Sequence, residues 1–335
     1  MSEILVNLEN VVWEEHSQNP IIEPPFYSPI IGDPTFVTPD LSPDGSFHLF
    51  AFSFLGLEHF TSTDGLSYKK VSRKGLPFKA LRPFIYKLDG GTFALYYEKV
   101  LSLVPHTRFM QSRIEVVLSK DLFTWSNPQV VFEPDKSWHE GVCGNPCLVK
   151  DESGFRLYFS AGRVFLPDCM FIEPKHIGVA FSKDPLSDFQ GLESPIISPD
   201  TTNLHMNLGS GSAKVLRAGS KYVAFINGIF EAGHSPNGQK YSSSGIKIFD
   251  SQDGLSWKSP GNEFLLAPST SSLKGDELTF AVTKRKNRGW KHAFIYACDV
   301  REYNGELWMY FNARDGWFIG KERIGLIKGA LRTAS

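Results

Sequence analysis

Short runs of hydrophobic and aromatic residues, bounded by polar residues and glycine, recur along the chain. Five of these runs are dense in the residues typical of β-strands, and they lie at residues 46–52, 92–98, 155–161, 221–227 and 306–312. Shorter runs precede them across a glycine-bearing turn, at residues 32–37, 81–86, 144–149, 211–216 and 298–303. We therefore expect five antiparallel hairpins, each formed by the first and second run of one unit.

Third and fourth strands extend each repeat. Four of the third strands end in similar sequences, FTSTDGLSY, VVLSKDLFTW, VAFSKDPLSDF and IFDSQDGLSW, and the fifth is RIGLIKG. Fourth strands are expected at 128–134, 194–199 and 262–268, whereas the last unit has none of its own. Residues 19–24 have the same pattern, and pairing them with the last unit would close a ring without exposed sheet edges.

This pattern predicts an all-β fold, a single five-bladed β-propeller closed by an N-terminal strand that completes the last blade. The expected blades cover residues 29–78, 79–135, 138–200, 205–268 and 296–335 plus 19–24, with an insertion at 269–295 that covers part of one face. A β-sandwich with accidental similarity among its strands is the alternative. Five copies in the same order and a displaced fourth strand favour the propeller.

The composition supports many short strands and argues against two classes of partner. Aromatic residues make up 13% of the chain, and 29 Gly and 21 Pro interrupt it. A net charge of −1 provides no concentrated positive charge for nucleic acid or an acidic membrane. The N-terminus lacks the basic start and apolar core of a secretion signal, so we expect a cytoplasmic protein. The four cysteines are expected to be buried free thiols.

Polar residues open the otherwise apolar inner strands of the predicted propeller. Aligning the five units places the following residues at equivalent positions: Asp33, Arg82, Asn145, Ser212 and Asp299. In an antiparallel blade the inner strand begins where the second strand ends, so these side chains should surround one channel mouth. Because buried polar groups without partners cost several kcal/mol, a functional mouth explains them better than a core position. For Asp33, the alternative is a role in ordering the turn before a proline.

Loops between second and third strands reach the same mouth and carry further charged residues. This set comprises Glu58, Glu98, His106, Arg108, Arg163, Glu173, His176, Glu231, His234, Arg314 and Asp315. The arginines Arg82, Arg163 and Arg314 suggest an anionic or polyhydroxylated ligand, although ion pairing within the protein would also explain them.

Five blades, an N-terminal closing strand and the acid in GDPTFV together resemble the five-bladed furanosidase superfamily. That superfamily includes glycoside hydrolase families 43 and 32 and, more distantly, the family-130 phosphorylases. The resemblance implies that Asp33 is the general base of an inverting hydrolysis, and that a Glu in a later blade is the general acid. Arg82, Asn145 and Ser212 stand where a second acid would be expected, and Glu140, in HEGVCGNP, is the nearest carboxylate that could replace it.

The leading hypothesis is hydrolysis of a glycosidic bond by two carboxylates roughly 6.5–9.5 Å apart. Asp33 would be the base and Glu140 the acid, with Asp299 or Glu98 as substitutes. The expected partner is a carbohydrate, bound by Arg82, Glu98, Asn145, Arg163, Ser212, Glu231 and Arg314. We expect no cofactor, and no metal-ligand spacing is recognisable.

Two other functions fit the same residues. Phosphorolysis or glycosyl transfer would use one acid and place Arg82, Arg163 or Arg314 on a phosphate or carboxylate. A glycan-binding propeller without catalysis would explain why three inner strands open without an acid.

Overall fold

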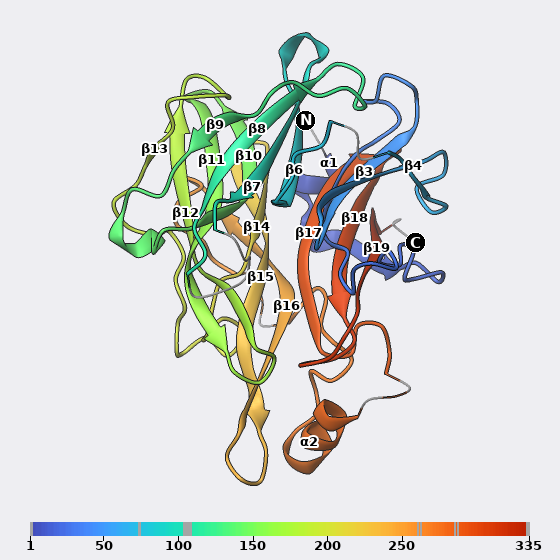
Figure 1. The fold of residues 1–335 in the computed structure, drawn as a ribbon, viewed down its shortest axis with the longest axis vertical. Coiled ribbons are helices and arrows are strands. Elements are labelled where there is room, and N and C mark those ends of the chain that lie inside the picture. Colours follow the sequence, from blue (N-terminus) through green and yellow to red (C-terminus); the bar gives the residue numbers. More distant parts are fainter. Residues whose placement is uncertain are drawn as a thin grey trace.

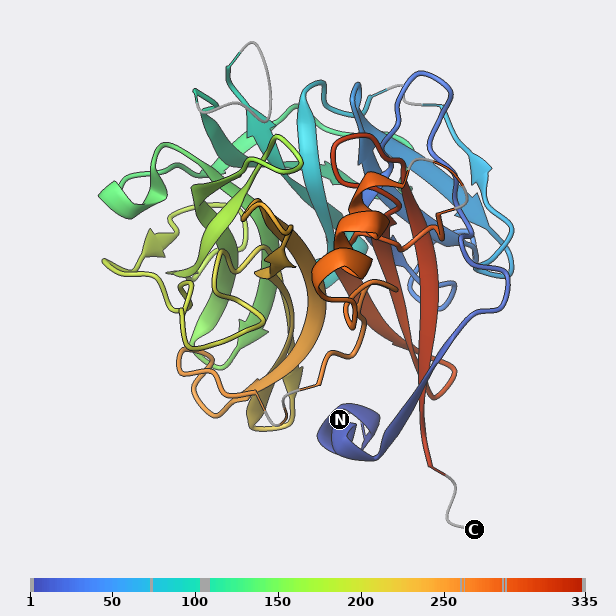
Figure 2. The same ribbon diagram turned by 90° about the horizontal axis from the view of Figure 1, so that it is seen from below.

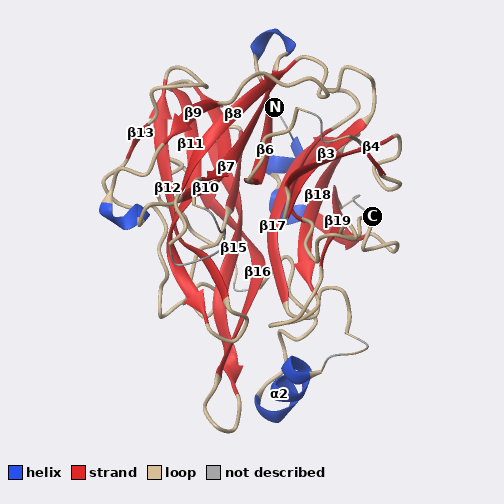
Figure 3. Ribbon diagram, viewed as in Figure 1, coloured by secondary structure: helices blue, strands red, loops and turns tan. Residues whose placement is uncertain are grey.

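The computed structural model describes residues 3–332, apart from 73–74, 103–108, 260, 262, 285 and 287. Most of its regular structure is β-strand, in sheets that follow one another around a central region (Figures 1 and 3). Three sheets have four strands each. Their strands are β2 (Gly32–Val37), β3 (Phe47–Ser53), β4 (Gly56–Ser62) and β5 (Lys69–Lys70); β6 (Ala80–Lys87), β7 (Phe93–Val100), β8 (Ser112–Ser119) and β9 (Gln129–Phe132); and β10 (Cys143–Asp151), β11 (Gly154–Leu166), β12 (Phe171–Ser182) and β13 (Gln190–Gly191).

The fourth sheet has seven strands in the order β1-β19-β18-β17-β16-β15-β14. These strands are β14 (Ala213–Ala218), β15 (Lys221–His234), β16 (Lys240–Ser251), β17 (Phe294–Tyr303), β18 (Glu306–Arg314), β19 (Glu322–Leu331) and β1 (Val11–Glu15). One parallel bridge, between Ser244 and Phe294, joins β16 to β17. The sheet therefore consists of two antiparallel parts that meet at this bridge.

The N-terminal segment pairs with the last strand, but nearer the N-terminus than the sequence predicted. β1 runs antiparallel to β19 over its whole length. The predicted segment, residues 19–24, contributes only an isolated bridge between Ile22 and Ile324. Pro20 and Pro24 lack the N–H groups that a continuous ladder requires, which explains why the regular strand lies at 11–15 instead.

Aromatic side chains from neighbouring sheets interlock to form the core. Phe36 of β2 meets Tyr310 of β18 edge to face, with ring centroids 4.7 Å apart. Phe132 of β9 packs against Phe159 of β11, also at 4.7 Å. The four cysteines are buried free thiols, as predicted. The high aromatic content thus serves packing between sheets.

The repeated sequences at the ends of the third strands form tight turns. Asp64, Asp121 and Asp253 each accept hydrogen bonds from backbone N–H groups two and three residues later. Such carboxylates order a turn by taking up its unpaired donors. These turns lie on the face opposite the starts of the inner strands. The similarity of their sequences is therefore explained by the hydrogen bonds that the turns require.

Helices are few in the described part of the chain. The α-helices are α1 (Glu3–Val6) and α2 (Gly275–Thr283), and 3₁₀ turns lie at Leu8–Asn10, Asp89–Gly91 and Ser137–His139. α2 lies within the predicted insertion and is anchored by the buried Leu278, which joins a cluster with Phe230 and Trp317. Figure 2 shows α2 over the face where β2, β6, β10, β14 and β17 begin, which we call the mouth face.

Candidate active site

β-Bulges interrupt the inner strands β2, β6 and β10 close to the mouth face. Inside each bulge lies a residue with a left-handed backbone: Asp33 at φ 48°, Arg82 at φ 51° and Asn145 at φ 48°. Gly211 has the same conformation, at φ 51°, just before β14. For residues other than glycine this backbone costs about 1–3 kcal/mol, and strain of this kind concentrates at functional sites. The bulges therefore place equivalent side chains at the mouth.

The last unit departs from the sequence alignment. In β17 the bulge places Tyr296, not Asp299, at the position equivalent to Asp33. Asp299 is buried three residues further along, where its carboxylate accepts a hydrogen bond from Thr35 Oγ1 at 2.7 Å and so ties β17 to β2. Ser212 likewise lies one residue past the bulge position of its unit. The sequence alignment of the five units matched their polar residues. The pairing of each inner strand with its neighbour shows instead which residue lies in the bulge.

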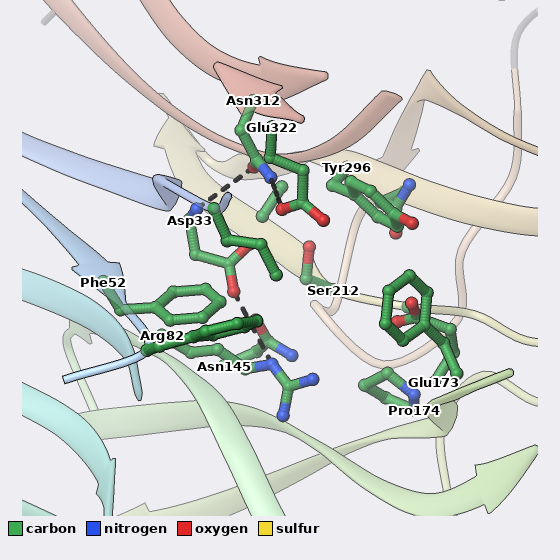
Figure 4. A pocket seen from close by; sticks show the side chains of 16 residues that line it. Asp33, Phe52, Arg82, Asn145, Glu173, Pro174, Ser212, Tyr296, Asn312 and Glu322 are labelled. Atoms are coloured by element: carbon green, nitrogen blue, oxygen red, sulfur yellow. Dashed lines mark hydrogen bonds and ion pairs between the residues drawn. The ribbon is translucent and has the colours of Figure 1, made fainter. Parts of the chain in front are cut away.

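The bulge residues open into a cavity at the mouth face (Figure 4). Its polar lining consists of Asp33, Arg82, Asn145, Glu173, Ser212, Asn227, Asn312 and Glu322. Its apolar lining includes Ile30, Phe52, Phe54, Phe171, Pro174 and Tyr296. The structure thus brings together the predicted residues Asp33, Arg82, Asn145 and Ser212.

Asp33 is held from two sides within this cavity. Its N–H donates a hydrogen bond to Asn312 Oδ1 at 3.1 Å, and its carboxylate lies 3.6 Å from Arg82 Nε. Burial raises the pKa of the Asp33 carboxyl to about 6, although the charge of Arg82 opposes the rise. At neutral pH the carboxyl is therefore ionised and still basic enough to accept a proton.

Two glutamates share the cavity with Asp33. Burial raises the pKa of Glu173, in β12, to about 8, and that of Glu322, at the start of β19, to about 7. Glu322 accepts hydrogen bonds from Asn312 Nδ2 at 3.2 Å and Arg314 Nη1 at 3.1 Å. Figure 4 shows Glu322 next to Asn312 on the side of Asp33, and Glu173 on the other side of the cavity. At neutral pH Asp33 is therefore mainly ionised and Glu173, on the other side of the cavity, mainly protonated, whereas the pKa of Glu322 lies between theirs.

The arginines that the sequence singled out are paired with glutamates. The pairs are Arg82 Nη1 with Glu98 Oε2 at 2.6 Å, Arg314 Nη1 with Glu322 Oε1 at 3.1 Å and Arg163 Nε with Glu140 Oε2 at 3.5 Å. Their positive charge is thus compensated within the protein. Ion pairing, which the sequence left open beside ligand binding, is present for all three arginines, and their predicted role in binding a ligand stays a prediction.

A second, smaller cavity adjoins the first. Arg82 and Glu173 line both cavities, and the predicted residues Glu98 and Arg163 line the smaller one. Glu173 therefore stands where two neighbouring compartments meet.

Glu140 and Glu231 lie outside the linings of both cavities. Glu140 follows the 3₁₀ turn Ser137–His139, and 39% of its side chain is exposed. Glu231, in the long β15, pairs with Lys240 at 2.7 Å. The roles predicted for both residues stay predictions, without support from the cavity geometry.

Sequence reasoning missed three polar residues of the cavity. Asn227 and Asn312 end the aligned runs KYVAFIN and ELWMYFN, so the repeat did contain a signal for them. Glu322 opens a third strand, and its burial beside Arg314 depends on packing that the pattern does not encode. Glu173 was one member of a large set of loop residues, and its place in the lining distinguishes it.

Within the described ranges, no group of three or more His, Cys, Asp or Glu side chains is placed to hold a metal ion. His106 and Arg108, also predicted at the mouth, lie outside the described residues. Among the helices that the structure describes, none has the length and apolar character needed to cross a membrane.

No family model matches the chain, and no curated protein matches it in sequence. In fold it is similar to an exo-1,5-α-L-arabinanase from a bovine ruminal metagenomic library, with a TM-score of 0.57 and 14% identity over 90% of this chain and 97% of that one. A structure from the GH130 family of mannoside phosphorylases, which contains glycoside hydrolases that target β-1,2 mannosidic linkages in Candida mannan, gives 0.58 and 14% over 94% and 93%. An N-acetylgalactosamine deacetylase from F. plautii, in complex with blood group B trisaccharide, gives 0.59 and 10% over 89% of each chain.

These similarities establish the fold. The chain shares its fold with the arabinanase and with the structure from the GH130 family, as the sequence resemblance implied for the architecture. The similar structures include a hydrolase and a deacetylase, so the fold by itself does not determine the reaction. The reaction has to be argued from the residues of the cavity.

Proposed function

We propose that this chain cleaves glycosidic bonds in the cavity lined by Asp33 and Glu173. One observation carries the proposal: these carboxyls face the cavity from opposite sides, with pKa values raised to about 6 and about 8. When two carboxyls have pKa values that differ in this way, one can act as base and the other as acid at the same pH. Hydrolysis of a glycoside requires this combination.

In the proposed reaction, Glu173 protonates the oxygen of the leaving group as the bond between that oxygen and the anomeric carbon breaks. Asp33 removes a proton from a water molecule, whose oxygen forms the new bond to the anomeric carbon from the opposite side. This arrangement inverts the configuration at the anomeric carbon. We favour Glu173 over Glu140 as the acid because Glu173 lines the cavity and Glu140 does not.

Glu322 supports Asp33 rather than reacting itself. Its carboxylate accepts a hydrogen bond from Asn312 Nδ2, and Asn312 Oδ1 accepts one from the Asp33 N–H. The amide orientation of Asn312 is therefore fixed by both neighbours. In this scheme Glu322 keeps the strained backbone of Asp33 in place.

Hydrolysis fits the cavity better than phosphorolysis. A phosphorylase needs positive charge or well-placed donors for phosphate. Arg82 and Arg314, the arginines nearest the carboxyls, already pair with Glu98 and Glu322. A phosphate would have to compete with these buried ion pairs, which costs free energy.

The proposal is tested by incubating the protein with a panel of oligosaccharides and aryl glycosides, with and without inorganic phosphate. Nuclear magnetic resonance identifies the product and its anomeric configuration. Free sugar that first appears with inverted configuration, at a rate independent of phosphate, would support the proposal. A sugar 1-phosphate formed only with phosphate would replace hydrolysis by phosphorolysis, and sugar binding without turnover would favour the non-catalytic alternative.

We also infer that the molecule is a five-bladed propeller closed by its N-terminal strand. The four-stranded sheets supply three blades, and the two antiparallel parts of the seven-stranded sheet supply the other two. Closure is supported by the pairing of β1 with β19 and by the burial of Ile4 and Leu5 in a cluster with Phe225 of β15. The N-terminal segment thus contacts both parts of the large sheet.

A further inference from the structure

Exposed apolar side chains are concentrated on the mouth face. Among the described residues, fifteen large hydrophobic side chains are exposed. Twelve of them lie on loops, on hairpin ends or on α2 at the mouth face, and four of the five predicted blades contribute at least one. The three exceptions are Val12, Phe123 and Val130. Isolated exposed apolar residues are ordinary, but their accumulation around one cavity marks an interaction surface.

The apolar side chains continue into the cavity itself. Phe54, in the turn between β3 and β4, lines the cavity although 56% of its surface is exposed, so its ring reaches from the cavity to solvent. Phe171 also lines the cavity, and the guanidinium of Arg314 lies 4.5 Å from the centre of its ring. This contact fixes the ring in place. The cavity therefore has an apolar rim beside its polar residues.

The position of Phe171 relates this rim to the proposed acid. Phe171 and Glu173 are two residues apart in β12, so both side chains project from the same side of the strand. A leaving group whose oxygen is protonated by Glu173 would therefore continue past Phe171. The sugar that reacts would occupy the polar part of the cavity, next to Asp33.

We propose that this site takes alkyl glycosides, in which a sugar is joined to a long hydrocarbon chain, and that Phe54 and Phe171 contact that chain. This inference builds on the proposed function and names its substrate class. A second sugar in the leaving position would bring hydroxyl groups that need hydrogen-bonding partners. The exposed phenylalanine side chains of the mouth face, among them Phe280 of α2 and Phe318 of the turn between β18 and β19, provide no such partners.

The experiment measures equilibrium binding, which does not require turnover. Methyl, phenyl and octyl glycosides of the same sugars are titrated below their micellar concentrations into the full chain carrying Asp33→Asn, and the dissociation constants are obtained by calorimetry. Octyl glycosides should bind at least about tenfold more tightly than methyl glycosides, a gain that corresponds to the burial of about two methylene groups. Phenyl glycosides should fall between the two.

Two matched variants test whether Phe54 contacts the octyl chain. Phe54→Ser should remove most of the gain from the octyl chain, so that the ratio of the dissociation constants for methyl and octyl glycosides falls towards one. Phe123→Ser changes an exposed phenylalanine on the opposite face and should preserve the gain. Both substitutions are at exposed positions, and circular dichroism verifies that each variant is folded.

Equal affinities for methyl and octyl glycosides, or no binding of either, would overturn the inference. So would a gain that Phe54→Ser leaves intact, or a preference for disaccharides over octyl glycosides. Turnover by the unmodified chain tests the proposed function separately. An enzyme that cleaves oligosaccharides but does not discriminate between alkyl chains would retain the function and lose the substrate class.

Discussion

Asp33 combines a strained backbone, a buried carboxyl and two fixed neighbours. Its left-handed conformation at φ 48° is unfavourable for most residues, and the bulge of β2 maintains it. Asn312 and Arg82 hold the main chain and the side chain. Such an arrangement preorganises a group for chemistry, at some expense of stability.

The first prediction concerns the base. Asn tolerates the left-handed conformation well, so Asp33→Asn should remain folded while losing the ability to accept a proton. We expect turnover to fall by about a hundredfold or more, with little change in the dissociation constant for sugar. Steady-state kinetics and calorimetry measure the two quantities.

Asp299→Asn is the matched control. Asp299 ties β17 to β2 through Thr35 and does not line the cavity. We expect a lower melting temperature and nearly normal turnover below it. Normal turnover in Asp33→Asn, or a hundredfold loss in Asp299→Asn without destabilisation, would contradict the assignment.

The second prediction is the pH dependence of kcat/KM. Asp33 must be ionised and Glu173 protonated, so kcat/KM should fall below about pH 6 and above about pH 8. Glu173→Gln should lose the alkaline limb, because the amide does not titrate. Its turnover should be reduced strongly for poor leaving groups and weakly for good ones. Glu140→Gln should keep both limbs, and loss of the alkaline limb in that variant would instead make Glu140 the acid.

At the scale of elements, the bulged inner strands position side chains of the site, whereas the N-terminal strand covers a sheet edge. The bulges in β2, β6 and β10 place side chains at the mouth. β1 covers the edge of β19, which would otherwise expose unpaired N–H and C=O groups. The first device serves the site and the second serves the integrity of the fold.

The third prediction tests the N-terminal strand. Deleting residues 1–17 removes α1 and β1 and should lower the melting temperature by about 5–10 °C, as expected for the loss of a few kcal/mol in a protein of this size. Deleting residues 1–10 removes α1 and the 3₁₀ turn Leu8–Asn10 but keeps β1, and should have a smaller effect. Differential scanning calorimetry measures both. An unchanged melting temperature after the longer deletion would reject closure by β1.

At the scale of the whole molecule, the two faces have different properties. Tight turns ordered by Asp64, Asp121 and Asp253 close one face, whereas long hairpins and α2 build the mouth face around buried carboxyls. Burial disfavours the ionised form of these carboxyls, so the free energy of unfolding depends on pH. The site therefore lowers the stability of the whole fold at alkaline pH.

The fourth prediction follows from Glu173. Its pKa is raised from 4.5 to about 8 in the folded protein, so between these values the folded state binds more protons than the unfolded state. The free energy of unfolding should therefore fall as the pH rises through this window. Urea unfolding at about pH 5 and about pH 9 should show a decrease that is smaller in Glu173→Gln by of order 1 kcal/mol or more. Glu140→Gln should follow the unmodified protein, and a pH dependence that is the same in Glu173→Gln would refute the burial of an ionisable Glu173.

The sequence by itself determined the repeated hairpins, the all-β class, the buried cysteines and the place of Asp33, because alternation and turn chemistry are local properties of the chain. It also pointed to Arg82, Asn145 and the mouth loops, since each opens or joins recognisable strands. Only the tertiary structure decided that Tyr296 replaces Asp299 in the bulge register. It also decided that the half-buried Glu173 and the buried Glu322 line the cavity while Glu140 is exposed. A one-residue bulge shifts which side chain faces inward without changing the hydrophobic pattern, and burial of a loop carboxyl depends on strands far away in the sequence. These long-range effects set the pKa values on which the proposed chemistry depends.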